Sequence, residues 1–344
     1  MQAEYQQYIL NFKRPSGTSR GVLTTKETWF LKISDGERAG YGECGLLRGL
    51  SIDDRPDYEE KLKWVCNNIN LGQEMLWDEL KEFPSIQFGV EMAFRSLEAK
   101  RPFELFPSDF TKGKASIPIN GLIWMGEKAF MKSQIREKIE AGFDCIKMKI
   151  GAIDFETELE LLKYIRSEFS SEEMELRVDA NGAFSPGNAL EKLKRLSEYE
   201  IHSIEQPIKQ GQLEEMAALC EETPLPIALD EELIGVFEET KKQRLIQIIN
   251  PQYVIFKPSL IGGFKGTEEW MKIAELQDTG WWITSALESN IGLNAISQWT
   301  YTKASPMPQG LGTGSLYTNN IKSPLFVENG NINYNPAISW DFKF

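Results

Sequence analysis

The sequence is short of the residues on which many catalytic and metal sites depend. It contains one histidine, His202, among 344 residues. A site with three histidine ligands is therefore excluded, and a histidine-dependent triad could rest only on that residue. The four cysteines include no close pair of the kind that binds zinc or exchanges disulfides. We expect reduced cysteines, and proton transfer by carboxylates, lysines or tyrosines.

The chain also lacks an excess of positive charge and a long hydrophobic segment. Its 38 Lys and Arg residues against 51 Asp and Glu residues give a net charge of −13, which would repel nucleic acid and anionic membrane surfaces. The longest apolar run, Met216 to Cys220, is far shorter than the ~18 residues that cross a bilayer. The first twenty residues have no apolar signal-peptide core. We expect a cytoplasmic protein whose partner is a small molecule, with no nucleic acid or membrane partner.

Residues 1–100 predict an α+β domain. Thr28 to Ile33 alternates as a strand does, and Ala39 to Glu43 can return as its antiparallel partner after an Asp-Gly turn. Apolar residues three or four apart predict a helix over Ser85 to Lys100. Residues 101–115 contain two prolines and no sustained period, which is typical of a linker between domains.

From residue 116 onward, strand-like and helical segments alternate with a repeat of roughly 25 to 30 residues. The predicted strands end near Leu122, Ile150, Asp179, Glu205, Asp230, Lys257 and Ala286. Asp154 is a suitable N-cap for the helix after Ile150. Consecutive βα units form parallel sheets. Seven or eight of them, without a Gly-rich phosphate loop after the first strand, favour a closed barrel.

The predicted elements divide the chain into two domains. We expect a capping domain at residues 1–100 and a barrel at residues 101–319. A final hairpin around Asn329-Gly330 is predicted near the end of the chain. We expect the C-terminal segment 320–344 that contains it to return to the capping domain.

Ionisable residues stand at the ends of five consecutive predicted strands, the place where barrel enzymes carry their chemistry. They are Lys147 and Lys149, Asp179 with Asn181, Glu205, Asp230 with Glu231, and Lys257. From Lys149 to Asp179, Glu205, Asp230 and Lys257, the successive separations are 30, 26, 25 and 27 residues, or one βα repeat each. The three acids should therefore lie on adjacent strands with a lysine on each side.

Three neighbouring carboxylates repel one another unless a cation joins them, and an all-oxygen site suits Mg²⁺ or Mn²⁺ better than zinc. We therefore predict that Asp179, Glu205 and Asp230 bind a metal ion. A metal beside lysines suits removal of a proton α to a carboxylate, because the cation stabilises the charge that forms. Lys149 is the candidate base, and Lys147 together with burial would lower its pKa.

Each of these residues also has an ordinary explanation. A single lysine or acid at a strand end is more often a solvated side chain or a structural ion pair, whereas five in the same register favour a site. For His202 we expect a hydrogen-bonded position in the interior or at the bottom of the barrel. Trp124 follows the first barrel strand and is a candidate for the wall of a substrate pocket.

The ordered set of strand-end residues resembles the enolase superfamily, in the branch of muconate lactonising enzyme. The resemblance is carried by Lys147-x-Lys149, Asp179-x-Asn181, Glu205-Gln206-Pro207, Asp230-Glu231 and Lys257-Pro258. It implies a modified (β/α)7β TIM barrel with an α+β N-terminal capping domain. It also implies Mg²⁺ at the three acids, with Asn181 behind them.

Within that branch the chain is most similar to the o-succinylbenzoate synthase family, through the segments 40–51, 285–292 and 310–316. This resemblance implies a lyase of menaquinone biosynthesis that dehydrates 2-succinyl-6-hydroxy-2,4-cyclohexadiene-1-carboxylate to 2-succinylbenzoate. Lys149 would remove the ring proton and return it to the leaving hydroxide in a syn elimination. Lys257 would stabilise the intermediate from the opposite face.

The same resemblance implies residues that contact the substrate or support the site. They are Asn181, Glu231, Ser285, Glu288, Ser289, Gly312, Thr313, Ser19 and Arg20. Two positions depart from the family pattern, because Glu232 and Asn290 stand where serines are common.

Two alternatives remain open at this point. An N-acylamino acid racemase or a dipeptide epimerase of the same superfamily would also use a lysine on each face of the substrate. The dipeptide epimerases carry an Asp-x-Asp near the last strand, and residues 310–314 contain no acid. A non-catalytic barrel that binds a metal or an acidic metabolite belongs to a different class, and it would not exchange a substrate α-proton in D2O.

Overall fold

An antiparallel sheet forms the N-terminal part of the chain. A computed structural model describes residues 1–18 and 21–344. The sheet has the order β1-β2-β3, with β1 at Gln2–Thr18, β2 at Gly21–Ser34 and β3 at Ala39–Cys44. The predicted hairpin is confirmed, since β2 and β3 pair antiparallel from Trp29 opposite Cys44 to Ser34 opposite Ala39. About half of the side chains of β1 are exposed, and the short stretch Tyr8, Leu10 and Phe12 alternates with exposed residues, which is a weak signal for a strand of this length.

Helix α3 packs so closely on the capping sheet that side chains are excluded at the contact. The helices of this part are α1 (Tyr58–Asn67), η1 (Ile69–Leu71), α2 (Gln73–Glu79) and α3 (Pro84–Glu98). A Cβ atom on Gly42 of β3 would lie 1.9 Å from the carbonyl oxygen of Gly89 in α3. The two main chains therefore touch, which fixes β3 and the loop that follows it.

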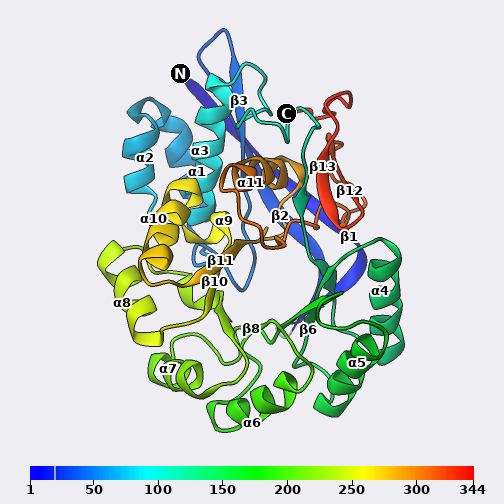
Figure 1. The fold of residues 1–344 in the computed structure, drawn as a ribbon. Coiled ribbons are helices and arrows are strands. Elements are labelled where there is room, and N and C mark those ends of the chain that lie inside the picture. The colour runs from blue at the N-terminus through cyan, green and yellow to red at the C-terminus, as the bar shows by residue number, and fades with distance from the viewer. Residues whose placement is uncertain (19–20) are drawn as a thin grey trace.

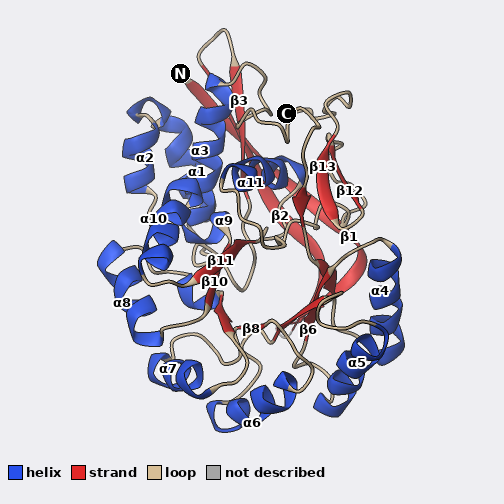
Figure 2. Cartoon of the chain, in the orientation of Figure 1, coloured by secondary structure: helices blue, strands red, loops and turns tan. Residues whose placement is uncertain are grey.

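The larger part of the chain is a curled parallel sheet covered on its outer face by helices (Figures 1 and 2). The sheet order is β11-β10-β9-β8-β7-β6-β5. Its strands are β5 (Gly121–Ile123), β6 (Cys145–Lys149), β7 (Glu175–Asp179), β8 (Ser203–Glu205), β9 (Ile227–Leu229), β10 (Tyr253–Phe256) and β11 (Gly280–Ile283). The outer helices are α4 (Lys128–Glu140), α5 (Phe155–Glu168), α6 (Pro186–Ser197), α7 (Leu213–Glu222), α8 (Glu239–Ile249) and α10 (Gly263–Leu276). This is the predicted modified TIM barrel.

The strand β6 and the helix α5 that follows it form where local sequence patterns favour them. Ile146 and Met148 of β6 are buried in the main hydrophobic core, while the alternate residues Lys147 and Lys149 form ion pairs with acids of the neighbouring strands. The Asp154 side chain accepts a hydrogen bond from the Thr157 N–H, as predicted for the N-cap of α5. None of the helices in the described part of the chain is long and apolar enough to cross a membrane.

Two residues close the barrel between its first and last strands. Gln309 pairs with Ile119 just before β5, and Gly310 pairs with Thr284 just after β11. The Gly310 N–H donates to the Ile283 carbonyl at 2.8 Å, and the Asn120 N–H donates to the Gln309 carbonyl at 3.0 Å. Gln309 and Gly310 therefore occupy the place of an eighth strand.

The C-terminal segment packs against the capping sheet. After α11 (Asn290–Thr302), the predicted hairpin is confirmed as β12 (Leu325–Glu328) and β13 (Asn331–Tyr334), and β13 pairs with β4 (Ile117–Pro118). The Phe342 ring then lies 5.0 Å from Phe30 of β2 and 5.4 Å from Tyr41 of β3, between ring centroids. On these contacts we propose a capping domain of residues 1–100 and 320–344 on a barrel of residues 101–319.

Candidate active site

A cavity of about 700 Å³ lies at the carboxyl ends of the barrel strands. Its barrel wall includes Lys147, Lys149, Asp179, Asn181 and Lys257. Residues 47–50, in the loop that follows β3, line the same cavity from the capping domain. The cavity therefore has walls from both parts of the chain. Of the polar residues predicted at the strand ends, these five line it, whereas Glu205, Asp230 and Glu231 are buried and are not part of its lining.

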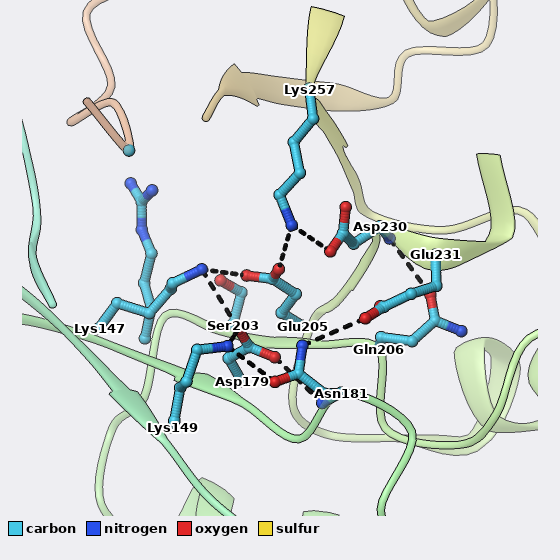
Figure 3. Close-up of polar contacts among 12 residues, drawn as sticks. Lys147, Lys149, Asp179, Asn181, Ser203, Glu205, Gln206, Asp230, Glu231 and Lys257 are labelled. Atoms are coloured by element: carbon cyan, nitrogen blue, oxygen red, sulfur yellow. Dashed lines mark hydrogen bonds and ion pairs between the residues drawn. The ribbon is translucent and has the colours of Figure 1, made fainter. Parts of the chain in front are cut away.

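The register of the parallel sheet places the predicted residues in a row. Lys149 pairs with Asp179 on the next strand, and Asp179 pairs with Glu205 on the strand after that. Asp230 comes directly after β9, and Lys257 directly after β10. Because these strands are neighbours in the sheet, the carboxylates lie between the two lysines, as Figure 3 shows.

Each of the three acids is paired with a lysine ammonium group. Lys149 Nζ lies 2.8 Å from Asp179 Oδ2, and Lys147 Nζ lies 2.6 Å from Glu205 Oε2 and 3.3 Å from Asp179 Oδ2. Lys257 contacts Asp230, and its Nζ lies 3.5 Å from Glu205 Oε1. The acids are 1 to 3% exposed, so each needs a cation nearby.

The carboxylates do not converge into a ligand cluster in this arrangement. Across residues 1–18 and 21–344, no three His, Cys, Asp or Glu side chains lie close enough together to hold a metal ion. The lysine ammonium groups supply the positive charge instead. The donor set of three buried carboxylates on adjacent strands nevertheless consists of the oxygen ligands that Mg²⁺ prefers.

Burial and the lysines act in opposite directions on these acids. Burial alone would raise the pKa of Asp179, but the ammonium groups of Lys149 and Lys147 outweigh it and hold that pKa below its usual range. Burial raises the pKa of Asp230 well above its usual value despite Lys257. Burial lowers the pKa of Lys257, but Asp230 and Glu205 more than reverse this effect.

The chain after β7 and β8 adopts unusual backbone conformations. Asn181 has a φ of 45° and Gln206 a φ of 40°, in the left-handed region that side chains other than glycine seldom adopt. The Asn181 Oδ1 accepts a hydrogen bond from Lys149 Nζ at 2.7 Å, and its Nδ2 donates to Glu231 Oε1 at 3.2 Å. Asn181 therefore links the candidate base to Glu231, as a supporting residue of the site would.

Gln206 belongs to the Glu205-Gln206-Pro207 motif, but the sequence interpretation gave its side chain no role. Its Oε1 accepts a hydrogen bond from the Asp230 N–H at 3.2 Å, and its Nε2 donates to the Ile208 carbonyl at 3.0 Å. Glu232, the departure from the family pattern, accepts a hydrogen bond from the Gly211 N–H at 3.1 Å. Both side chains hold the loops beside Asp230. The only sequence signal for Gln206 is its position next to Glu205.

Some of the other predicted contact residues line the cavity, and others are buried behind its wall. Ser285, Gly312 and Thr313 line the cavity, and the hydroxyl oxygens of Ser285 and Thr313 are 2.7 Å apart. Glu288 and Ser289 are fully buried behind this wall. Ser19 and Arg20 lie outside the described residues.

His202 lies away from the strand-end row, as predicted. Its ring packs on Tyr253 with centroids 4.9 Å apart, and its Nδ1 forms a 2.9 Å hydrogen bond with the Ser203 hydroxyl. Burial lowers the pKa of His202. Tyr253 is the first residue of β10, so His202 stands at the opposite end of the barrel from Lys257.

Comparisons with known proteins point to the same family for both parts of the chain. Residues 131–337 match the family model of enolase C-terminal domain-like proteins, and residues 2–97 match the MenC N-terminal domain. An o-succinylbenzoate synthase of Desulfotalea psychrophila is 47% identical over 96% of this chain and 98% of its own length. The crystal structure of MenC from that organism covers 97% of this chain and 99% of its own, with a TM-score of 0.86 and 44% identity.

Two further relatives have other activities. An N-succinylamino acid racemase of Thermus thermophilus is 33% identical over 80% of this chain and 75% of its own. A dipeptide epimerase from Enterococcus faecalis, solved with Mg and a dipeptide, shares the fold with a TM-score of 0.84 at 18% identity, and the match covers 97% of this chain and 96% of its own.

Proposed function

Because this chain belongs to the enolase superfamily and carries the MenC N-terminal domain, we propose that it catalyses the o-succinylbenzoate synthase reaction of menaquinone biosynthesis. The substrate is 2-succinyl-6-hydroxy-2,4-cyclohexadiene-1-carboxylate, and the products are 2-succinylbenzoate and water. The 47% identity to the Desulfotalea synthase over nearly both full lengths supports this reaction. The observation that carries it is the row of ion-paired side chains at the strand ends, in which Lys149, Asp179 and Lys257 line one cavity. Glu205 and Asp230 are buried in the same row and contact Lys257.

We propose that Asp179, Glu205 and Asp230 hold a divalent metal ion, with Mg²⁺ as the natural choice for three carboxylates. Bound there, the cation would stabilise negative charge that develops on the substrate carboxylate. Three lysines pair with these acids, and Glu231, which is 1% exposed, adds a fourth carboxylate beside Asn181, so carboxylates outnumber ammonium groups around this position. Mn²⁺, with the same preference for oxygen ligands, is the alternative ion.

Lys149 is the proposed base and acid of the dehydration. As a free amine, its Nζ takes the proton from the ring carbon that bears the carboxylate, so the C–H electron pair moves into the ring. Expulsion of hydroxide from the neighbouring carbon breaks the C–O bond and completes the aromatic ring. The same Nζ then returns its proton to the departing hydroxide, which leaves as water. Asn181 and Asp179 hold Nζ at 2.7 and 2.8 Å, which orients it at the cavity wall.

Lys257 is proposed to act as a fixed positive charge on the other side of the substrate. It follows β10 whereas Lys149 ends β6, and three strands separate them in the sheet. Its ammonium group can stabilise negative charge on the ring without transferring a proton. The hydroxyl groups of Ser285 and Thr313 and the main chain of Gly312 are the proposed contacts for the succinyl carboxylate.

The proposed function is tested with the purified protein, Mg²⁺ and the succinyl cyclohexadiene substrate, whose aromatisation changes its ultraviolet absorbance. We expect rapid Mg²⁺-dependent conversion to 2-succinylbenzoate in the wild type, and conversion slower by about 10²-fold or more in the Lys149→Ala variant. Conversion that persists in Lys149→Ala at the wild-type rate, or no conversion by the wild type, would refute the proposal.

N-succinylamino acid racemisation is a second candidate function. The 33% identity to the Thermus racemase favours it, and lysines on two sides of the carboxylates suit removal and return of a proton on opposite faces. Exchange of the α-proton of N-succinylamino acids in D2O, compared with dehydration by their kcat/KM values, decides which activity predominates.

A further inference from the structure

A lysine with no hydrogen-bond partner is buried between the capping domain and the barrel. Lys26 of β2 is 4% exposed, and its Nζ has no hydrogen-bond partner among the described residues. Leaving an ammonium group buried in this way is costly unless opposite charges lie close to it. Burial holds the pKa of Lys26 below its usual value, and the nearby carboxylates of Glu43 and Glu288 reverse only part of this effect. These two carboxylates are therefore its counter-charges.

The two carboxylates come from the two parts of the chain. Glu43, in β3 of the capping domain, accepts hydrogen bonds from Ser289 N at 2.8 Å, Ser289 Oγ at 2.6 Å and Gly292 N at 2.8 Å, which lie at the start of α11. Thr28, on the same face of β2 as Lys26, donates to Glu43 at 2.8 Å. Glu43 thus fastens the capping sheet to the N-terminus of a barrel helix.

Glu288 holds the loop that lines the cavity. Its Oε2 accepts a hydrogen bond from the Ala286 N–H at 2.7 Å, and its Oε1 accepts one from the Ser259 hydroxyl at 2.5 Å. Ser285, Ala286 and Leu287 line the cavity directly in front of it. Glu288 therefore sets the course of this loop from behind, without facing the cavity.

Lys26 also lies beside the second loop of the cavity. A Cβ atom on Gly45, which follows β3, would lie 3.3 Å from Lys26 Nζ and 3.3 Å from Glu288 Cγ. Residues 47–50, a few positions further along, line the cavity. The ammonium group thus stands at the point where the capping loop and the barrel loop meet, behind both walls of the cavity.

We propose that Lys26 is a positioning residue whose charge, held between Glu43 and Glu288, keeps the capping loop 45–50 and the barrel loop 284–289 at the separation that the substrate requires. It acts through these loops and does not touch the substrate. Only the expected changes in KM and kcat rest on the proposed function. The placement of the two loops is independent of which substrate is bound.

The test compares Lys26→Met, which keeps the length of the side chain without its charge, with Lys242→Met. Lys242 is a matched control, since it is equally buried but pairs with Glu269 on the outer helices at 2.7 Å. We expect Lys26→Met to raise KM by about tenfold and to change kcat by less than about threefold, because ground-state and transition-state binding are lost together. We expect Lys242→Met to leave both constants unchanged.

Hydrogen–deuterium exchange provides a readout that needs no substrate. In Lys26→Met, amides of residues 45–50 and 284–289 should exchange faster, while the rest of the barrel is unchanged. An unaltered KM with unaltered exchange in both loops would overturn the proposal. If the wild type proves inactive on the succinyl cyclohexadiene substrate, the proposed function fails, and exchange alone decides the role of Lys26.

Two more variants separate positioning from stability. Lys26→Met/Glu288→Gln removes both charges, so its unfolding free energy should lie closer to the wild-type value than that of Lys26→Met. Its KM should stay raised because the link between the loops is gone. If Lys26→Met does not fold, Glu288→Gln alone should raise KM and speed exchange in residues 284–289. Wild-type values for both readouts would overturn the proposal.

Discussion

The side chain of Gln134 binds both main-chain groups of Trp124. Its Oε1 accepts a hydrogen bond from the Trp124 N–H at 2.9 Å, and its Nε2 donates to the Trp124 carbonyl at 2.9 Å. The Trp124 ring centroid lies 6.0 Å from Lys149 Nζ, and the ring lines the cavity. We predict that Gln134→Leu, which removes both hydrogen bonds, lowers kcat/KM by about tenfold or more, because small displacements at a reacting centre slow catalysis.

Gln87→Leu is the control for this variant. Gln87 is equally buried in α3 and donates to the Trp77 carbonyl at 2.8 Å, away from the cavity. Gln87→Leu should lower the melting temperature, as Gln134→Leu does. Its kcat and KM should stay at the wild-type values. Equal kinetic effects of the two variants would mean that the Trp124 contact has no specific role.

Removal of either flanking lysine should slow the chemistry by orders of magnitude. We expect Lys149→Ala and Lys257→Ala to lower kcat by about 10²- to 10⁴-fold, the usual contribution of a positioned proton donor or charge. Exchange of the substrate proton with D2O distinguishes them, because only the variant that lacks the base should lose exchange entirely. Retained exchange in Lys149→Ala would assign the base elsewhere.

Metal binding should stabilise the folded protein and depend on the carboxylates. We expect Mg²⁺ to raise the melting temperature of the wild type in a saturable way, since a ligand that binds only the native state stabilises it by mass action. Asp230→Asn and Glu205→Gln should reduce this shift. Excess EDTA should remove activity, and added Mg²⁺ should restore it. Full activity in EDTA would contradict the metal assignment.

Glu91 should make stability depend on pH. Burial raises the pKa of Glu91 to about 8, although the N–H groups of Phe264 and Lys265 at the start of α10 oppose this. As pH rises from the ordinary value of 4.5 to about 8, the unfolded chain releases this proton while the folded state keeps it. The free energy of unfolding should therefore fall with pH, by at most about 1.4 kcal/mol per pH unit.

The Glu91→Gln variant should show a smaller slope than the wild type in denaturant titrations between about pH 6 and 8. Part of the slope should remain, because burial also raises the pKa of Asp53 to about 6 and that of Glu158 to about 7. Glu60→Gln, on an exposed position of α1, should keep the wild-type slope. An unchanged slope in Glu91→Gln would contradict the role of Glu91.

The contact between β3 and α3 should not accept a methyl group. Because a Cβ atom on Gly42 would lie 1.9 Å from the Gly89 carbonyl oxygen, we expect Gly42→Ala to lower the free energy of unfolding by about 3 kcal/mol, at the upper end for overpacked sites. Gly187→Ala in α6, where a Cβ atom meets nothing within 4 Å, should leave it unchanged or raise it. Chemical denaturation checks both variants.

The barrel and the strand-end row could be predicted because each depends on a period in the sequence. One βα repeat moves the chain by one strand, and alternate residues of a strand face the same side. Lys149, Asp179 and Glu205 therefore had to be neighbours once the repeat was recognised, and the register places them opposite one another.

The barrel closure, the roles of the two glutamines and the position of Lys26 depend on contacts that produce no repeating pattern in the sequence. Gln309 and Gly310 close the barrel through single pairings rather than a strand. Gln134 and Gln206 act through hydrogen bonds to main-chain groups, which any sequence offers. The charge of Lys26 is balanced by Glu288, 262 positions away in the chain. Such contacts depend on how the two domains pack against each other, and this packing cannot be derived from a single sequence.

The return of Phe342 to the capping sheet has a consequence for how the protein is made. On a ribosome the chain emerges from its N-terminus, and domains tend to fold in that order. The rings of Phe30 and Tyr41 nevertheless receive Phe342 only after the whole barrel has been synthesised. Until Phe342 has been synthesised, Phe30 and Tyr41 can therefore pack only on earlier rings, such as Tyr8 and Phe103.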